Sequence, residues 1–333
     1  MAKVMRQYAC LHSHSTHSDG VYTPEELVKI ASDEGYGALA VTDHDTVTAN
    51  APLASYAKEY GLDCLFGVEF STKCKHNGMG YHLTAFDFDE SYPEMRDYLN
   101  KLSAKETHQT QELFKRGVEI GYIHDITWDE VLSYNTGISW LCNEHVFRAM
   151  KAKGLCTDKD YPEFFATCYG PYRSTVEPLY SFKSTEEVID LVHMAGGIAV
   201  IAHPFLNVNN ADKTLNCFDY FHSLGIDGIE VWHPDQSARW RRIALELALK
   251  YDLYVSGGAD HAGLLGGQYE RFSNPEETEY FFPSLTLGTT EYFFDEIKKK
   301  SKSHDRREHI SALLADSSLW QMTGGIIDKR DTR

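Results

Sequence analysis

Short apolar segments alternate with helical patterns along the first 90 residues. The segments of strand length are residues 8–11, 38–42, 63–71 and 80–89. A helix signature follows the first of them, because Thr23 and Glu26 can form a capping box and Pro24 suits a first helical turn. Leu27 and Ile30 then fall on one helical face. These features predict strands that alternate with helices.

The same alternation returns after residue 181. Ser184 and Glu187 can cap a helix that Gly196 ends, and residues 237–251 form a second helical pattern. Further strand ends lie in the segments 198–202, 226–234 and 252–263. Strands that alternate with helices favour an α/β fold with a parallel sheet, closed into a barrel or doubly wound.

Residues 91–180 interrupt this alternation. They are rich in helix formers and aromatic residues, and Thr127 and Glu130 offer another capping box. We interpret them as a mostly helical insertion that caps the substrate. The predicted parts are an α/β barrel of residues 1–90 and 181–297, the insertion of residues 91–180, and a polar, peripheral C-terminal segment of residues 298–333.

The composition is that of an ordinary globular chain, but its charge is strongly negative. Hydrophobic residues make up 42% and charged residues 24% of the 333 residues, and the formal net charge is −17. So acidic a chain repels polyanions at long range, which disfavours a polymeric nucleic acid as partner. A small phosphorylated substrate stays compatible, because a bound metal ion reverses the charge locally.

The sequence also bears on location. The longest uninterrupted apolar run, residues 198–202, is too short to span a membrane, and the first 14 residues lack the apolar core of a signal peptide. Seven cysteines without a CxxC pair suit reduced thiols. We therefore expect a cytoplasmic protein without a membrane partner, and the sequence leaves the oligomeric state open.

Histidine and carboxylate side chains recur at the strand ends. They are His12, His14, Asp19, His44, Glu69, His203, Asp260 and His261, and His82 joins them from the start of its segment. The active site of a parallel barrel lies at the carboxyl ends of its strands. His12 and His14 are two residues apart, so in a strand they face the same side and can bind one ion. Mixed imidazole and carboxylate ligands suit zinc, iron or manganese.

These residues occur in a specific order of motifs: H-x-H-x₄-D-G, T-D-H-D, G-x-E, a lone histidine, A-H-P and G-x-D-H. The order resembles the PHP family, the polymerase and histidinol phosphatase domains, and above all its stand-alone phosphoesterases. The resemblance implies a distorted (β/α)₇ barrel of the TIM-like kind that holds two or three divalent ions (Mn, Fe or Zn). It implies hydrolysis of a small phosphate ester (nucleotide, sugar or polyol phosphate, or cyclic phosphate) by a hydroxide that bridges the metals.

Carried over to this chain, the resemblance implies three ligand sets. They are His12, His14, Glu69 and Asp260 for the first ion, Glu69, His82 and His203 for the second, and Asp19, His44 and His261 for the third. Family members commonly read D-x-H at the last motif, whereas here Asp260 and His261 are adjacent and Ala262 takes the expected place. Either the backbone turns there so that His261 reaches the third ion, or the third site is weak or empty. Glu69, Asp260 and His261 are the expected catalytic residues.

The insertion is the expected source of substrate contacts. The segment "NEHVFRAMKAKG" resembles the family's R-x-H-x-x-R helix, whose Arg and His meet the substrate phosphate. Asn143 replaces the first Arg, while His145 and Arg148 remain, and Arg173 offers a substitute cation. A solvated surface charge is the alternative for Arg148. For His233, which follows a strand, we expect a supporting or loop role at least as readily as a direct one.

Three other functions remain open. An amidohydrolase-type C–N hydrolase would use the same hydroxide on a carbonyl, although a flat carbonyl gains little from a third cation. An exonuclease on nucleic acid ends is possible by family analogy, although the charge of −17 disfavours it. A non-catalytic domain would have lost ligands, whereas all but one stand here in the expected place.

Overall fold

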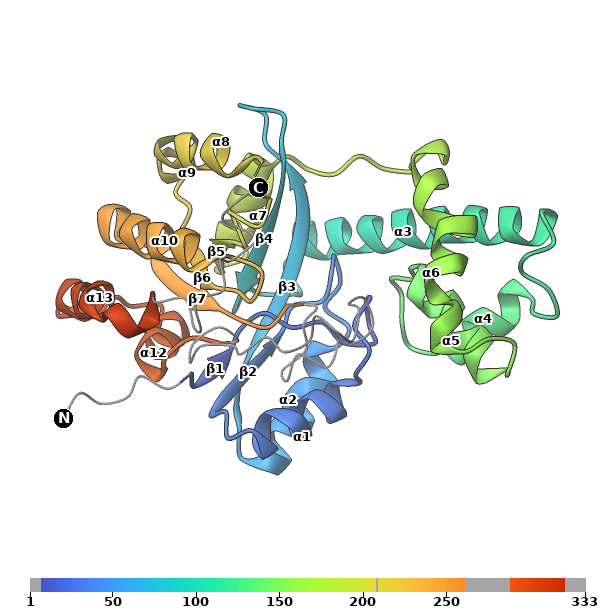
Figure 1. The fold of residues 1–333 in the computed structure, drawn as a ribbon, viewed down its shortest axis with the longest axis horizontal. Helices are drawn as coiled ribbons and strands as arrows, with labels where there is room; N and C mark the ends of the chain where they lie inside the picture. Colours follow the sequence, from blue (N-terminus) through green and yellow to red (C-terminus); the bar gives the residue numbers. More distant parts are fainter. Residues whose placement is uncertain (1–6, 208, 261–287, 321–333) are drawn as a thin grey trace.

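The fold is built on one seven-stranded sheet that curves into a nearly closed barrel (Figure 1). The computed structural model describes residues 7–207, 209–260 and 288–320. The strands are β1 (Ala9–Cys10), β2 (Ala38–Val41), β3 (Asp63–Lys73), β4 (Gly80–Phe86), β5 (Ile198–Ile201), β6 (Gly228–Trp232) and β7 (Tyr254–Gly257). They pair in chain order. Just past the end of β1, the N–H of Leu11 donates to the carbonyl of Gly257, the last residue of β7, over 2.9 Å, which brings the two edges together.

Helices cover the outside of the sheet and form the insertion. The α-helices are α1 (Pro24–Asp33), α2 (Asn50–Tyr60), α3 (Pro93–Glu119), α4 (Trp128–Tyr134), α5 (Asn143–Ala152), α6 (Tyr161–Phe164), α7 (Thr185–Met194), α8 (Ala211–Asn216), α9 (Phe218–Ser223), α10 (Ala238–Tyr251), α12 (Glu291–Lys299) and α13 (Arg306–Ala315). Shorter helical turns are η1 (Asp158–Asp160), η2 (Phe165–Tyr169), η3 (Gly170–Thr175) and η5 (Ser317–Leu319). The predicted capping boxes of α1, α4 and α7 are confirmed.

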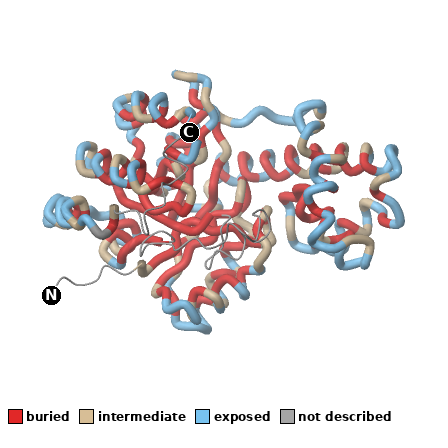
Figure 2. Tube along the Cα trace, in the orientation of Figure 1, coloured by how far each residue is buried: buried red, intermediate tan, exposed pale blue. Residues whose placement is uncertain are grey.

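The strands place alternate residues on opposite faces of the sheet, and both faces are buried (Figure 2). Ala38 and Ala40 of β2 belong to one cluster with Val200 of β5. Leu39 and Val41 belong instead to the cluster that packs under α1 and α2. A strand buried on both faces reads as a continuous apolar run, which is why these strands could be recognised in the sequence.

The expectation of parallel strands is wrong for β4. This strand is antiparallel to both neighbours, with Ser71 of β3 opposite His82 and Leu83 opposite Ile201 of β5. The physical reason is the connection, because a short hairpin without a helix joins β3 to β4, and a hairpin can only join antiparallel strands. The start of β4 therefore lies at the same barrel end as the carboxyl ends of the parallel strands. This direction brings His82 to the other strand-end histidines.

Helix α3 connects the barrel with the insertion (Figure 1). In its first half, Met95 and Leu102 pack in the barrel core, whereas Leu113 in its second half belongs to a separate core with Val146 and Phe147 of α5. The insertion thus has its own hydrophobic core, and the single continuous helix α3 contributes to both this core and the barrel core. The division of the chain into the three predicted parts stays a prediction.

The C-terminal helices are packed more closely than a peripheral segment would be. Ile310 and Leu313 of α13 are fully buried in the main core, and Phe293 of α12 joins them. The carboxylate of Glu296 and the guanidinium of Arg306 form a buried ion pair between the two helices. The polar composition after residue 298 concealed these buried positions. Within the described residues, the structure contains no helix with the length and apolar character needed to cross a membrane.

Candidate metal centre

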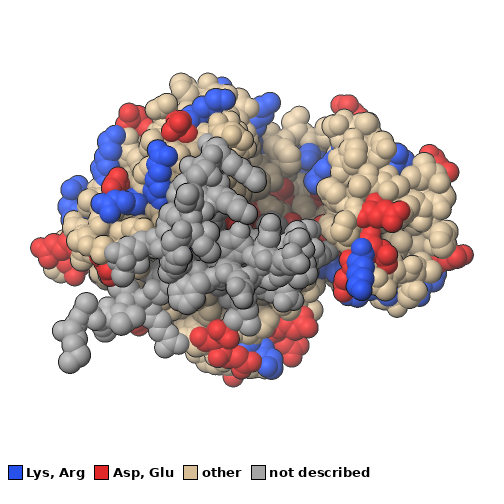
Figure 3. Space-filling model, in the orientation of Figure 1, with Lys and Arg blue, Asp and Glu red and all other residues tan. Residues whose placement is uncertain are grey.

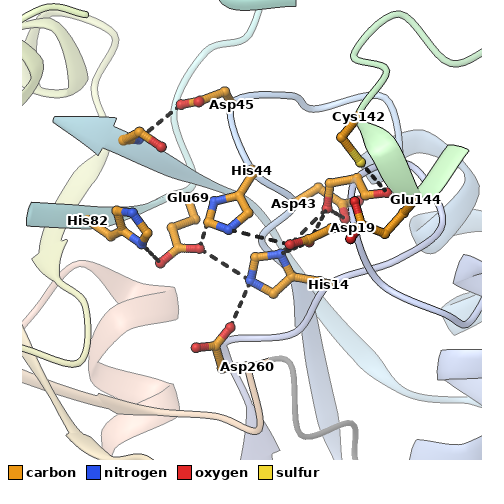
Figure 4. Close-up of polar contacts among 12 residues, drawn as sticks. His14, Asp19, Asp43, His44, Asp45, Glu69, His82, Cys142, Glu144 and Asp260 are labelled. Atoms are coloured by element: carbon orange, nitrogen blue, oxygen red, sulfur yellow. Dashed lines mark hydrogen bonds and ion pairs between the residues drawn. The ribbon is translucent and has the colours of Figure 1, made fainter. Parts of the chain in front are cut away.

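The strand ends bring the predicted ligand residues that the structure describes to one end of the barrel, and Figure 4 shows His14, Asp19, His44, Glu69, His82 and Asp260 among them. His12 and His14 follow β1, His44 follows β2, Glu69 lies within β3 and His82 within β4. His203 follows β5, and Asp260 follows β7. His12, His14 and Glu69 are at most 1% exposed, while the His82 side chain is 36% exposed. The centre therefore has a buried floor and an open side.

Four of these residues form a compact group with the geometry of a metal site. His12, His14, Glu69 and Asp260 each offer one ligand atom, and these atoms lie within 4.8 Å of one another. Nε2 of His14 is 3.0 Å from Oδ1 of Asp260 and 3.2 Å from Oε2 of Glu69. The group coincides with the ligand set expected for the first ion.

Glu69 joins this group to the other histidines. Its Oε1 is 3.0 Å from Nδ1 of His82 and 2.9 Å from Nε2 of His203. Two further groups that could hold an ion are His44, Glu69 and His82, and His14, Asp19 and His44. They share most of their members with the expected second and third sets, except that His44 appears beside His82 and His14 beside Asp19. His261, the remaining expected ligand, lies outside the described residues, and the role of each residue stays a prediction.

Hydrogen bonding prepares the His12 ring to bind a cation. Its Nδ1 lies 3.0 Å from Oε1 of Glu230. A carboxylate accepts hydrogen bonds, so Nδ1 carries a proton, and the ring in its neutral form has a lone pair on Nε2 that can bind a cation. That Nε2 is 3.3 Å from Nε2 of His14. Two ring nitrogens facing each other at this distance beside carboxylates fit a shared cation, and a carboxylate behind a ligating imidazole is common at metal sites.

The electrostatics of the buried centre also fit a cation. Burial raises the pKa of Glu69, but the imidazoles around it, first His82 and then His12, lower that pKa overall to well below its usual range. Burial lowers the pKa of His12, but Glu230, Glu69 and Asp260 raise it overall to well above its usual range. The buried carboxylates of the centre thus stay ionised, and positive charge nearby is needed to balance them. Either protons on the imidazoles or metal ions can supply that charge.

Two residues of the centre have a backbone in the left-handed region. Asp260 has a φ of 48° and His203 a φ of 27°, values that non-glycine residues rarely adopt and that often mark functional sites. The backbone thus departs from strand geometry at Asp260, and His261, the next residue, lies outside the described residues. Two glycines permit close backbone contacts there, because a Cβ on Gly20 would lie 2.1 Å from the carbonyl oxygen of His14 and one on Gly258 would lie 2.3 Å from the nitrogen of His12.

Sequence reasoning missed two carboxylates that support the centre. Glu230 lies in β6 and also accepts a hydrogen bond from the N–H of His203 over 2.6 Å. Asp43 accepts hydrogen bonds from the N–H and the hydroxyl of Ser15, over 2.7 and 2.6 Å. A signal for Glu230 existed, since an acidic residue inside the buried strand "GIEVW" needs a partner. His233 lies beside the centre, with Nε2 2.9 Å from Oδ2 of Asp260.

Two of the three predicted substrate-binding residues contact the loop after β1. Nε2 of His145 donates to the carbonyl of Thr16 over 3.1 Å, and its Nδ1 accepts from the N–H of Cys142 over 3.0 Å. The guanidinium of Arg148 donates to the carbonyls of Ser18 and Gly20, each over 2.8 Å. Neither residue lines the cavity at the centre. Their donors are engaged because α5 packs directly on this loop.

The third predicted residue, Arg173, lines a cavity of about 670 Å³ between the barrel and the insertion. Its other lining residues are Asp19, His44, Asp45, Ser71, His82, Glu106, Trp140, Cys142, Asn143, Glu144, Tyr161, Pro162, Phe165 and Phe182. Asp19, His44 and His82 thus face both the candidate metal centre and the cavity. A volume of this size is typical of sites for small molecules.

Comparisons with known proteins agree with this geometry. The PHP domain family model matches residues 11–168. The chain is 32% identical over 254 residues to the 5′-3′ exoribonuclease of Haemophilus influenzae, covering 75% of this chain and 88% of that protein. It is 26% identical over 269 residues to the phosphoribosyl 1,2-cyclic phosphate 1,2-diphosphodiesterase of Eggerthella lenta, covering 77% and 94%.

A solved structure resembles the whole fold. It is that of a protein from Bifidobacterium adolescentis described as a metal-dependent phosphoesterase. The TM-score is 0.68 at 26% sequence identity, and the match covers 90% of this chain and 98% of the other. The shared architecture therefore extends over both the barrel and the insertion.

Proposed function

The chain belongs to the PHP family, and on that premise we propose that it hydrolyses a small phosphate ester at the metal centre around Glu69. Hydrolysis of a phosphoester bond is the activity shared by the similar proteins. The finer proposal concerns the substrate, which we take to be a nucleotide, a sugar or polyol phosphate, or a cyclic phosphate. The observation that carries it is the cavity, whose wall includes Asp19, His44 and His82 of the candidate metal groups.

The residues of the centre have distinct proposed roles. His12, His14, Glu69 and Asp260 hold a first ion, Glu69, His82 and His203 a second, and Asp19 and His44 a third together with His261. Two or three ions of Mn, Fe or Zn, once bound, supply water that ionises near neutral pH and neutralise the charge of the phosphate. Glu69 contacts both of the first two groups, so it fixes their separation. Glu230 holds the His12 ring, and His233 holds the carboxylate of Asp260.

A substrate panel tests this function. The protein is stripped of metal, loaded with manganese and incubated with nucleotides, sugar phosphates, cyclic phosphates and, as a contrast, simple amides. We expect phosphate release or ring opening from at least one phosphate ester and its loss when a chelator removes the metal. Hydrolysis of amides without hydrolysis of any phosphate ester would favour the amidohydrolase alternative instead.

A second candidate is a 5′-3′ exoribonuclease, favoured by the 32% identity to the Haemophilus influenzae protein. The end of an RNA strand would have to enter the same cavity, and the net charge of −17 opposes its approach at low salt. A 5′-phosphorylated oligoribonucleotide and the matching mononucleotide separate the two functions. Release of nucleotides from the oligomer at a higher kcat/KM than phosphate release from the mononucleotide would support the exoribonuclease.

A further inference from the structure

The cavity wall opposite the metal centre is acidic. It is formed by the insertion, and Figure 3 shows the hollow between the insertion and the barrel with acidic atoms at its bottom. Glu106 and Glu144 line this wall, and they are only 5% and 8% exposed. Buried carboxylates facing a cavity accept hydrogen bonds and repel anions.

The positive charge on this wall is already engaged. Arg173 is the one Lys or Arg among the described lining residues. Its Nη2 lies 2.7 Å from both carboxylate oxygens of Glu106, and its Nε donates to Oε1 of Gln109 over 3.1 Å. Lys105 is nearby but does not line the cavity, and its ammonium lies 3.7 Å from the ring centre of Phe182. Because this guanidinium is paired with the carboxylate of Glu106, the pair adds no net positive charge to the wall that would attract a second phosphate.

Glu144 is held by neutral groups. Nδ2 of Asn143 donates to its Oε1 over 2.8 Å, and the hydroxyl of Tyr161 donates to the same oxygen. Within the described residues, no salt bridge to Lys or Arg neutralises this carboxylate. Aromatic side chains complete the wall, including Trp140, Phe165 and Phe182. The wall therefore offers flat apolar surface together with hydrogen-bond acceptors.

From this chemistry we propose that the wall binds the part of the substrate that is not cleaved, and that it favours substrates in which this part is an uncharged ring with hydroxyl or amino donors. The wall excludes substrates that carry a second phosphate. The inference rests on the proposed phosphoesterase function. The substrate ring stacks on the aromatic side chains of the wall, and the hydroxyl or amino donors of that ring reach the carboxylate of Glu144. A second phosphate on the same ring meets carboxylates and a guanidinium already paired with Glu106.

A matched pair of nucleotides tests the selection. Adenosine 5′-monophosphate and adenosine 3′,5′-bisphosphate are compared by kcat/KM with the manganese-loaded enzyme and by calorimetric dissociation constants with the metal-free protein. We expect kcat/KM and affinity to favour the monophosphate by about tenfold or more. This is the effect expected when the bisphosphate loses one charged hydrogen bond or meets one additional repulsive charge. Equal or better binding and turnover of the bisphosphate would overturn the selection.

Two isosteric variants test the assigned residues. Glu106→Gln releases Arg173, and Glu144→Gln removes a negative charge, so each should shift the bisphosphate-to-monophosphate ratio about tenfold toward the bisphosphate. The control is Glu112→Gln on the same helix α3, whose carboxylate pairs with Lys115 and does not line the cavity. An unchanged ratio in both folded variants would refute the assignment.

The outcomes separate this inference from the proposed function. If the loaded enzyme releases no phosphate from any ester, the proposed function fails, while the calorimetric ratio of the two nucleotides still tests the wall. If phosphate is released but the bisphosphate is preferred, the function stands and the inference fails.

Discussion

The guanidinium of Arg148 donates a 2.8 Å hydrogen bond to the carbonyl oxygen of Gly20, which lies 128 residues earlier in the chain. A second bond from the same guanidinium reaches the carbonyl of Ser18. Asp19, between the two acceptors, faces the candidate metal centre and the cavity. The insertion thus holds the loop that carries Asp19, and we propose that Arg148 acts as a positioning residue rather than as a phosphate ligand.

Replacing Arg148 by alanine should therefore lower stability as well as activity. Loss of the charged donor leaves two carbonyl acceptors without their partner, which costs about 1.5–3 kcal/mol in the free energy of unfolding. Urea unfolding and steady-state kinetics measure both effects. The control Lys151→Ala removes an exposed pair with Asp158 from the same helix and should change neither by much. A raised KM with an unchanged free energy of unfolding would indicate instead that Arg148 binds the substrate phosphate directly.

Replacing Glu69 by glutamine should remove metal and activity together. Its two oxygens contact imidazoles of both proposed metal groups, and because Glu69 is fully buried, bulk solvent does not compensate for the lost charge. Because removal of groups that merely support a ligand already costs about 10–100-fold, we expect a loss of at least about a hundredfold in metal affinity and turnover. Elemental analysis and phosphate release measure these losses. Full metal content with full turnover would exclude the joining role of Glu69.

Glu230→Gln should weaken metal binding while leaving the ligands themselves intact. The amide can keep a hydrogen bond to Nδ1 of His12, but it lacks the negative charge that makes the ring more basic. The expected loss of metal affinity is about 10–100-fold, measured by competition with a chromogenic chelator. Glu246→Gln on α10, whose carboxylate pairs with Arg242 at the surface, is the matched control. Equal metal affinities of the two variants would show that Glu230 does not support metal binding at the centre.

His193 makes stability depend on pH at a site remote from the metal centre. The hydrogen bond to Asp227 raises the pKa of His193 above 6.5, with burial opposing it. A raised folded-state pKa means that the stabilisation is fully present below about pH 6 and is lost as pH rises through the folded-state pKa. The side chain is 37% exposed, so the effect should stay within about 1 kcal/mol. His193→Gln should show this difference in urea unfolding at pH 5.5 and no difference at pH 8.5, whereas a pH-independent difference would contradict it.

Local sequence patterns were sufficient to predict much of the barrel. The capping boxes at Thr23, Thr127 and Ser184 were recoverable because each depends on residues three positions apart. The strands were recoverable because burial on both faces leaves a continuous apolar run. The residues of the candidate centre followed from their place at strand ends and from the order of their motifs. His261 was predicted in the same way and lies outside the described residues.

The tertiary structure decided what depends on contacts between distant segments. The direction of β4 placed His82 beside Glu69, and no periodicity within β4 encodes the direction of a strand. Glu230 became the partner of His12 across 218 positions of the chain. Arg148 and His145 were expected to contact phosphate, whereas in the fold they contact the loop after β1. Side-chain chemistry sets what a residue can bind, but its actual partner depends on which backbone the fold brings within hydrogen-bond distance.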